Sequence, residues 1–203
     1  MKKILLLILS VLYQILILPY ILYKAIEMYN DGLNPDSMKE MEKRMRFIFE
    51  ILKQDGWIEP EVSLMFDTTD TTCYYFSEIP EQEYININFA ELFLKKEKLR
   101  NAPHILNFLN NLYLESFFHE IGHYIDRANQ DLEDYQDFAI SDAVTQMFFR
   151  DLYEPDDITA QKHYQELPSE KIAFYYGLDI YNYLKDVLNE NLFNYLFAPF
   201  QKS

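Results

Sequence analysis

Residues 116–126 read SFFHEIGHYID and hold two of the four histidines in the chain, His119 and His123. Residues four apart on a helix share one face, so both imidazoles can reach a single metal ion. Glu120 lies about 100° around the helix from His119, where it can accept a proton from an attacking water. This HExxH spacing predicts a zinc site with His119 and His123 as ligands and Glu120 as general base.

The helix that carries this motif is expected to be buried. It is apolar over most of its circumference, with Phe117, Phe118, Ile121, Tyr124 and Ile125 between and beside the polar positions. Two histidines and a glutamate buried without partners would cost several kcal/mol, and a zinc ion supplies a partner. The alternative is an ordinary buried helix whose histidines are satisfied by hydrogen bonds. Gly122, which costs about 1 kcal/mol in a helix, indicates close backbone packing or room for a substrate.

A catalytic zinc site needs a third protein ligand and one open position. Glu170 lies in PSEKIAFYYG (168–177), just after Pro168, a residue suited to the start of a helix. On that helix Glu170 shares a face with Ala173 and Gly177, which would let the helix approach the HExxH helix closely. We therefore expect Glu170 to be the third ligand. Otherwise it is an ordinary acidic residue in a first helical turn.

Other acidic residues compete for roles at the metal. Asp142 and Asp137, in QDFAISDAV (136–144), are alternative third ligands. Asp126 lies seven residues beyond His119, on the metal face of the helix. It is expected either to accept a proton from a histidine ring nitrogen or to form a salt bridge with a downstream Lys or Arg.

HEIGHYID followed several tens of residues later by PSEKIAFYYG resembles the gluzincin zinc metallopeptidases. In particular it resembles the anthrax lethal-factor-like catalytic domain, shared by secreted Pro-Pro endopeptidases. The resemblance implies a zincin-like fold, with His119, His123 and Glu170 as zinc ligands and Glu120 as general base. It also implies a tyrosine shortly before the third ligand that stabilises the oxyanion. In this chain His163 or Tyr164 takes that place.

The rest of the chain indicates an α+β fold. A helix is expected from Met38, capped by Ser37, to about Gln54, ending at Asp55-Gly56. Residues 57–90 contain three short segments rich in β-branched and aromatic residues: EVSLMF, TCYYF and EYININF. In the last, apolar residues alternate with Asn86 and Asn88, which predicts a half-buried strand that could border the cleft. Helical periodicity follows from Ala90, so a small sheet precedes a helical lobe.

The N-terminus differs from the rest in charge and hydropathy. Ile4 to Tyr23 form 20 residues without a charge, which as a helix would span about 30 Å, the thickness of a bilayer core. Residues 1–30 carry a net charge of +2 and the remaining residues −17. We expect residues 1–29 to be an uncleaved signal anchor with its basic end inside, and residues 30–203 to be an extracytoplasmic domain. A cleaved signal peptide, giving a secreted protein, and a buried soluble helix are the alternatives.

Composition excludes several classes of protein. The 203 residues carry a net charge of −15, which argues against nucleic acid, because Lys and Arg must neutralise its phosphates. The four glycines form no phosphate-binding loop. Cys73 is the only cysteine, so a disulfide scaffold is excluded.

Together these patterns predict a membrane-anchored, extracytoplasmic zinc metalloendopeptidase that binds one catalytic Zn²⁺ and hydrolyses a protein or peptide substrate. The rival hypothesis is a zinc-containing binding or interaction module without catalysis. A fourth protein ligand that closes the coordination shell, such as Asp126 or Asp142, would favour that rival.

Overall fold

The computed structural model describes residues 22–23, 26, 35–67, 71–75, 77, 79–100, 111–130 and 166–198. The chain divides into two compact units, one of Met1–Glu40 with Phe200–Ser203 and one of Met41–Pro199. The second unit contains almost all of the described residues and all of the described strands and helices, apart from the start of one helix.

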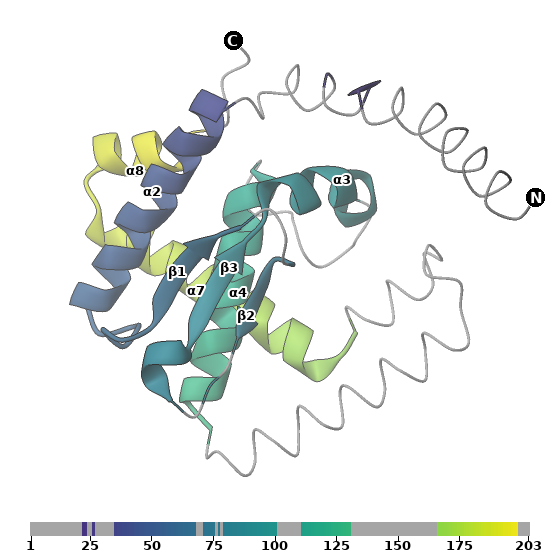
Figure 1. Cartoon of the computed structure of the whole chain (residues 1–203). Coiled ribbons are helices and arrows are strands. Elements are labelled where there is room, and N and C mark those ends of the chain that lie inside the picture. Colours follow the sequence, from purple (N-terminus) through teal and green to yellow (C-terminus); the bar gives the residue numbers. More distant parts are fainter. Residues whose placement is uncertain are drawn as a thin grey trace, which may run out of the picture. The chain divides into compact units, whose positions relative to one another are not determined.

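The first half of this unit contains a three-stranded mixed sheet (Figure 1). Its strands are β1 (Ser63–Phe66), β2 (Cys73–Tyr75) and β3 (Tyr84–Ile87), in the order β1-β3-β2. β1 runs parallel to β3 and β2 antiparallel to it, with Leu64, Ile85 and Tyr74 in one row across the sheet. A 3-10 turn, η1 (Pro80–Gln82), connects β2 to β3. The β2 strand therefore lies at an edge.

The structure corrects two expectations about the EYININF segment. Its strand, β3, is the central strand of the sheet and not an edge strand; β2 lies at an edge and contacts the HExxH helix. Asn86 and Asn88 are also buried, with 1% and 5% of their surface exposed. Both side chains have a hydrogen-bond partner that offsets burial: Asn86 Nδ2 donates to the carbonyl of Thr71, and Asn88 Oδ1 accepts from the Glu91 amide. Among the described residues, Asn86 Oδ1 has no partner.

Helix α2 (Pro35–Gln54) begins three residues before the expected Met38. Proline suits the first position of a helix, so Ser37 lies inside the helix and is not its cap. The predicted apolar face is confirmed, since the buried side chains are Met41, Met45, Ile48, Phe49 and Leu52. The helix ends where expected, at Gln54, and Gly56 just beyond it has a φ of 78°, a left-handed conformation that favours glycine.

In the described part of the chain after the sheet, the helices are α3 (Phe89–Arg100), α4 (Leu112–Ala128), α7 (Pro168–Val187) and α8 (Glu190–Phe197). Helix α4 lies against β2 and β3 and packs along much of its length on α7 (Figure 1). The Phe118 ring of α4 stacks on the Phe197 ring of α8, with 5.8 Å between the ring centres, and the Tyr181 ring of α7 contacts both. This aromatic cluster ties α4, α7 and α8 together.

The α+β class, with a small sheet followed by helices, is confirmed. Within the part of the chain that the structure describes, no helix is both long and apolar enough to cross a membrane. Apart from Leu22 and Tyr23, the expected span Ile4–Tyr23 lies outside the described residues.

Candidate metal centre

Helix α4 carries the whole HExxH motif. It begins at Leu112, where the side chain of Asn111 caps it by accepting a hydrogen bond from the Leu114 amide at 3.3 Å. Its apolar side chains are buried, as the sequence predicted, with Phe117, Phe118 and Ile121 fully inaccessible. Successive residues point about 100° apart, so His119 and His123, four residues apart, share one face of α4.

Helix α7 delivers Glu170 to this face from its first turn. Pro168 occupies the start of the helix, as expected, although no side chain caps it. The buried positions, Glu170, Ala173, Gly177, Ile180 and Leu184, form one stripe with helical spacing. Glu170 is only 5% exposed, so its carboxylate is held inside the interface between the helices.

Two glycines let the backbones of α4 and α7 touch. A Cβ atom on Gly122 would lie 1.9 Å from the carbonyl oxygen of Ala173, and one on Gly177 would lie 2.8 Å from that of Phe118. Both distances are shorter than any non-bonded contact that a real Cβ atom makes. Close packing is therefore the role of Gly122, and it sets the distance at which Glu170 meets the histidines.

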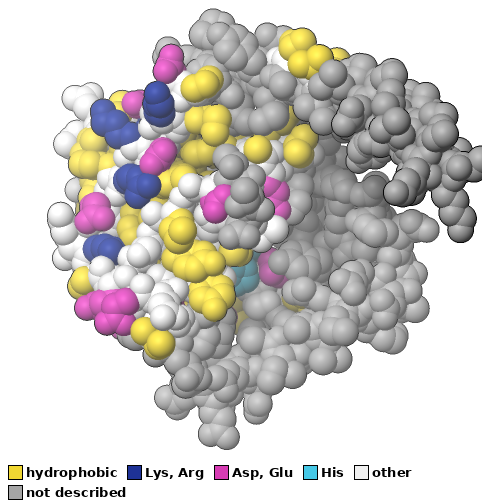
Figure 2. Space-filling view, in the orientation of Figure 1, with side chains coloured by type: hydrophobic (Ala, Val, Ile, Leu, Met, Phe, Trp, Pro, Cys, Tyr) yellow, Lys and Arg dark blue, Asp and Glu magenta, His cyan; other side chains and the backbone are white. Residues whose placement is uncertain are grey.

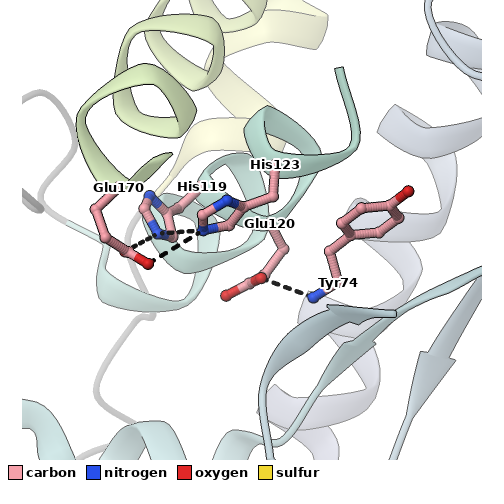
Figure 3. Close-up of polar contacts among 5 residues, drawn as sticks. All are labelled: Tyr74, His119, Glu120, His123 and Glu170. Carbon is pink, nitrogen blue, oxygen red and sulfur yellow. Dashed lines mark hydrogen bonds and ion pairs between the residues drawn. The ribbon is translucent and has the colours of Figure 1, made fainter. Parts of the chain in front are cut away.

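The side chains of His119, His123 and Glu170 converge (Figure 3). Nε2 of His119 lies 3.0 Å from Oε2 of Glu170 and 3.1 Å from Nε2 of His123. Nε2 of His123 lies 3.6 Å from Oε1 of Glu170. Two ligand atoms on a tetrahedral zinc ion stand about 3.3 Å apart, because each bond is about 2.0–2.1 Å long. The two imidazole nitrogens and the two carboxylate oxygens thus lie at separations close to those between ligand atoms on one zinc ion.

Hydrogen bonds satisfy this trio incompletely. Nε2 of His119 lies close to two polar atoms, Oε2 of Glu170 and Nε2 of His123. Because a ring nitrogen carries either one proton or one lone pair, it can form a hydrogen bond with only one of them. Nδ1 of the same ring is buried and has no hydrogen-bond partner among the described residues. A cation would instead accept a lone pair from each of the three side chains, so the donor set fits zinc.

The histidines differ in their affinity for protons. Burial lowers the pKa of His119, but the hydrogen bond and the charge of Glu170 outweigh it, so the net pKa is raised. Burial, with the charge of His119, lowers the pKa of His123 to about 4. His123 is therefore neutral near pH 7 and keeps a lone pair for a metal.

Glu120 points away from α7, toward the sheet (Figure 3). The backbone amide of Tyr74 in β2 donates a hydrogen bond of 2.8 Å to Glu120 Oε2. Burial raises the pKa of Glu120 to about 7, although the charge of His119 and the Tyr74 amide both act to lower it. A carboxylate with a pKa near neutrality is well matched to accepting and returning a proton.

The site is accessible from outside. The side chains of His119 and His123 are 11% and 20% exposed. Figure 2 shows a histidine at the surface beside an acidic side chain and a group of hydrophobic side chains. Part of each imidazole is thus accessible from the surface.

The remaining predicted residues have different outcomes. Asp126 is buried, and its Oδ1 accepts a hydrogen bond of 2.6 Å from the side chain of Gln130, a partner that we did not expect. The oxyanion donors His163 and Tyr164 and the alternative ligands Asp137 and Asp142 lie outside the described residues.

Sequence reasoning missed Tyr74. The segment TCYYF was expected to be a strand, and it is one, but nothing in its residues indicates that a main-chain amide would meet Glu120. Strand partners are set by contacts distant in sequence, so only the fold reveals this donor.

Comparisons of the chain with protein-family models, with curated proteins and with solved structures gave no match. The resemblance to gluzincins therefore rests on the motif residues themselves.

Proposed function

We propose that this protein is a zinc metalloendopeptidase of the gluzincin type, with a zincin-like catalytic domain. The observation that carries the proposal is the convergence of His119, His123 and Glu170. Glu120 lies next to them on the same helix as the histidines, and its side chain is directed toward β2. Three ligands leave a tetrahedral metal with one open position, as catalytic zinc sites do. The partly exposed histidines agree with such an opening.

Each of these residues would have a separate role in the reaction. His119, His123 and Glu170 hold the metal, which when bound lowers the pKa of a coordinated water toward about 7 and polarises the scissile carbonyl. Glu120 takes the proton of the attacking water and delivers it to the leaving amine. Tyr164 or His163 donates a hydrogen bond to the oxyanion of the substrate.

Metal analysis combined with peptide hydrolysis tests this function. The full-length chain, Glu120→Gln and the control Glu166→Gln are purified in detergent, analysed for zinc and incubated with a peptide library. Glu166 is an exposed carboxylate near the start of α7 that pairs with Lys171. We expect about one zinc per chain in all three proteins, and hydrolysis in all but Glu120→Gln.

Other outcomes would contradict the proposal. Activity that survives in Glu120→Gln excludes Glu120 as the general base. Full zinc content without any hydrolysis by the wild-type chain favours the binding module.

The location of the domain is a second part of the proposal. It rests on the uncharged stretch Ile4–Tyr23 after two lysines and on the acidic remainder of the chain. We propose a single-pass anchor with the catalytic domain outside the cytoplasm. Protease added to intact cells should degrade the domain, and recovery of an intact domain from such cells would contradict this orientation.

A further inference from the structure

One oxygen of Glu120 is held by the edge of the sheet. Among the described residues β2 pairs with β3 alone, so alternate amides of β2 point away from the sheet, and that of Tyr74 reaches Glu120 Oε2 at 2.8 Å. Figure 3 shows the second oxygen of Glu120 on the side of His119, His123 and Glu170. The hydrogen bond thus fixes which oxygen faces the metal ligands.

The side chain of Tyr74 is anchored in its turn. Its phenol donates a hydrogen bond to Oε1 of Glu83, and its ring meets Tyr124 of α4 edge-on, with 5.8 Å between the ring centres. Glu83 is only 2% exposed, and a buried carboxylate is costly unless it is hydrogen-bonded. The proposed reaction does not use this carboxylate, but its hydrogen bond fixes the phenol of Tyr74.

The residue before β2 is fastened as well. Thr72 donates its amide to the Glu91 carboxylate, and its hydroxyl accepts from the Asn88 amide at 3.0 Å. Both partners belong to the start of α3, where Asn88 caps the helix through the Glu91 amide. Hydrogen bonds therefore fix β2 to Glu83 and, through Thr72, to the start of α3, close to the point where β2 contacts Glu120.

We infer that Tyr74 and Glu83 are positioning residues for the general base. Glu83 holds the phenol of Tyr74, which fixes the edge strand so that the Tyr74 amide orients the Glu120 carboxylate. The inference rests on the proposed function, since it concerns the base of that reaction. It assigns a role to a buried glutamate that neither binds metal nor touches substrate. The role should appear in the rate of the chemical step and not in metal binding.

Hydrogen exchange tests the contact without any substrate or metal. Because the Tyr74 amide points away from β3, pairing within the sheet does not protect it. We expect residue-resolved exchange of the metal-free, full-length chain to show protection at Tyr74. Glu120→Ala should speed this exchange about tenfold or more, with the amides of Cys73 and Tyr75 unchanged. Equal exchange at Tyr74 in both proteins would refute the contact.

Kinetics test the positioning. In Tyr74→Phe and Glu83→Leu we expect kcat to fall about tenfold, with KM and zinc content unchanged. Glu83→Gln keeps an acceptor for the phenol and should recover most of the lost rate. The double variant Tyr74→Phe/Glu83→Leu should be no slower than either single variant, because both break one contact. Tyr75→Phe, which alters the exposed neighbouring ring, serves as the matched control and should retain the wild-type kcat.

The outcomes separate the inference from the function on which it rests. Unchanged kcat in Tyr74→Phe and Glu83→Leu, or a loss that Glu83→Gln does not recover, would overturn the positioning role. A wild-type chain that binds zinc and hydrolyses nothing would overturn the proposed function, while the exchange experiment still decides whether Tyr74 holds Glu120. If Glu83→Leu fails to fold, Glu83→Gln and Tyr74→Phe still decide the kinetic result.

Discussion

Helix α7 and strand β2 approach α4 from different sides, and each brings one polar group to the HExxH motif. α7 meets α4 backbone to backbone at Gly122 and Gly177 and supplies the Glu170 carboxylate. β2 meets α4 through a hydrogen bond from the Tyr74 amide to Glu120 and through an edge-on ring contact with Tyr124. The metal ligands are thus held on one side and the base on the other.

The two contacts should respond differently to mutation. A contact between bare backbones has no side chain that can move aside, so any added atom separates the helices. A strand held by hydrogen bonds from several side chains can lose one and keep its fold. We therefore expect substitutions on the α7 side to reduce stability and metal binding, and substitutions on the β2 side to act mainly on the reaction.

The largest effect is expected from Gly122→Ala. The added Cβ would meet the Ala173 carbonyl oxygen at 1.9 Å, so the helices must part. We expect a loss of about 3 kcal/mol, which lowers Tm by roughly 6–12 °C despite the better helix propensity of alanine. Thermal unfolding measures it. Gly177→Ala, with a contact of 2.8 Å, should lose about half as much. Equal stability of Gly122→Ala and wild type would contradict the backbone contact.

Glu170→Gln is expected to act next most strongly, on metal binding. A neutral amide is a poorer zinc ligand than a carboxylate, so zinc affinity should fall about 100-fold or more in competition with a chelator. Glu166→Gln removes a carboxylate four residues earlier that is paired with Lys171 at the surface. It should bind zinc as the wild type does. Similar affinities in Glu170→Gln and Glu166→Gln would exclude Glu170 as a ligand.

Asn88→Ala probes the β2 side with a smaller effect. It removes the side chain that caps α3 by accepting from the Glu91 amide at 3.0 Å, which costs about 1 kcal/mol, or roughly 2–4 °C in Tm. Asn189→Ala removes a similar cap from α8, where Asn189 accepts from the Leu192 amide. Both variants should lose similar stability, but only Asn88→Ala should speed exchange of the Tyr74 amide. Faster exchange in both would show that the α3 cap has no special link to β2.

The smallest effect concerns an exposed contact of α7. Tyr183 donates a hydrogen bond of 2.8 Å to Asp55, and this bond, more than burial, raises the pKa of the phenol above 10.0. A group whose pKa is higher in the folded than in the unfolded chain stabilises the fold at pH values below its unfolded pKa. This contribution disappears as the pH rises through its folded pKa. Tyr183→Phe should therefore be slightly less stable than wild type at neutral pH. The gap in Tm should close above pH 10. A gap that widens with pH would contradict this assignment.

The helical half of the site could be predicted from sequence because its information is local. A spacing of four places His119 and His123 on one face of α4. Pro168 and the small residues Ala173 and Gly177 indicate where α7 begins and which face it buries. Because Glu170 lies on that buried face, the sequence indicated it as the third ligand. Even here the cap of α4, Asn111, was not anticipated.

The sheet could not be predicted in the same way, since strand order depends on pairing between distant segments. The alternation in EYININF gave the strand β3 but not its central place. Asn86 and Asn88 were expected to face solvent, yet their partners Thr71 and Glu91 make burial possible. The edge position of Tyr74 follows from the same pairing and is equally invisible in the sequence.

The separation of the ligands along the chain has a consequence for folding. His119 and Glu170 are 51 residues apart, and their side chains meet at 3.0 Å. A metal ion bound to both would act as a reversible cross-link that closes this loop. In the unfolded chain, closing a loop of that length raises the free energy by about 4 kcal/mol, because it removes conformational entropy. A metal ion would therefore bind the folded chain in preference to the unfolded one and stabilise the fold, and this stabilisation would persist in a variant, such as Glu120→Gln, that no longer performs the reaction.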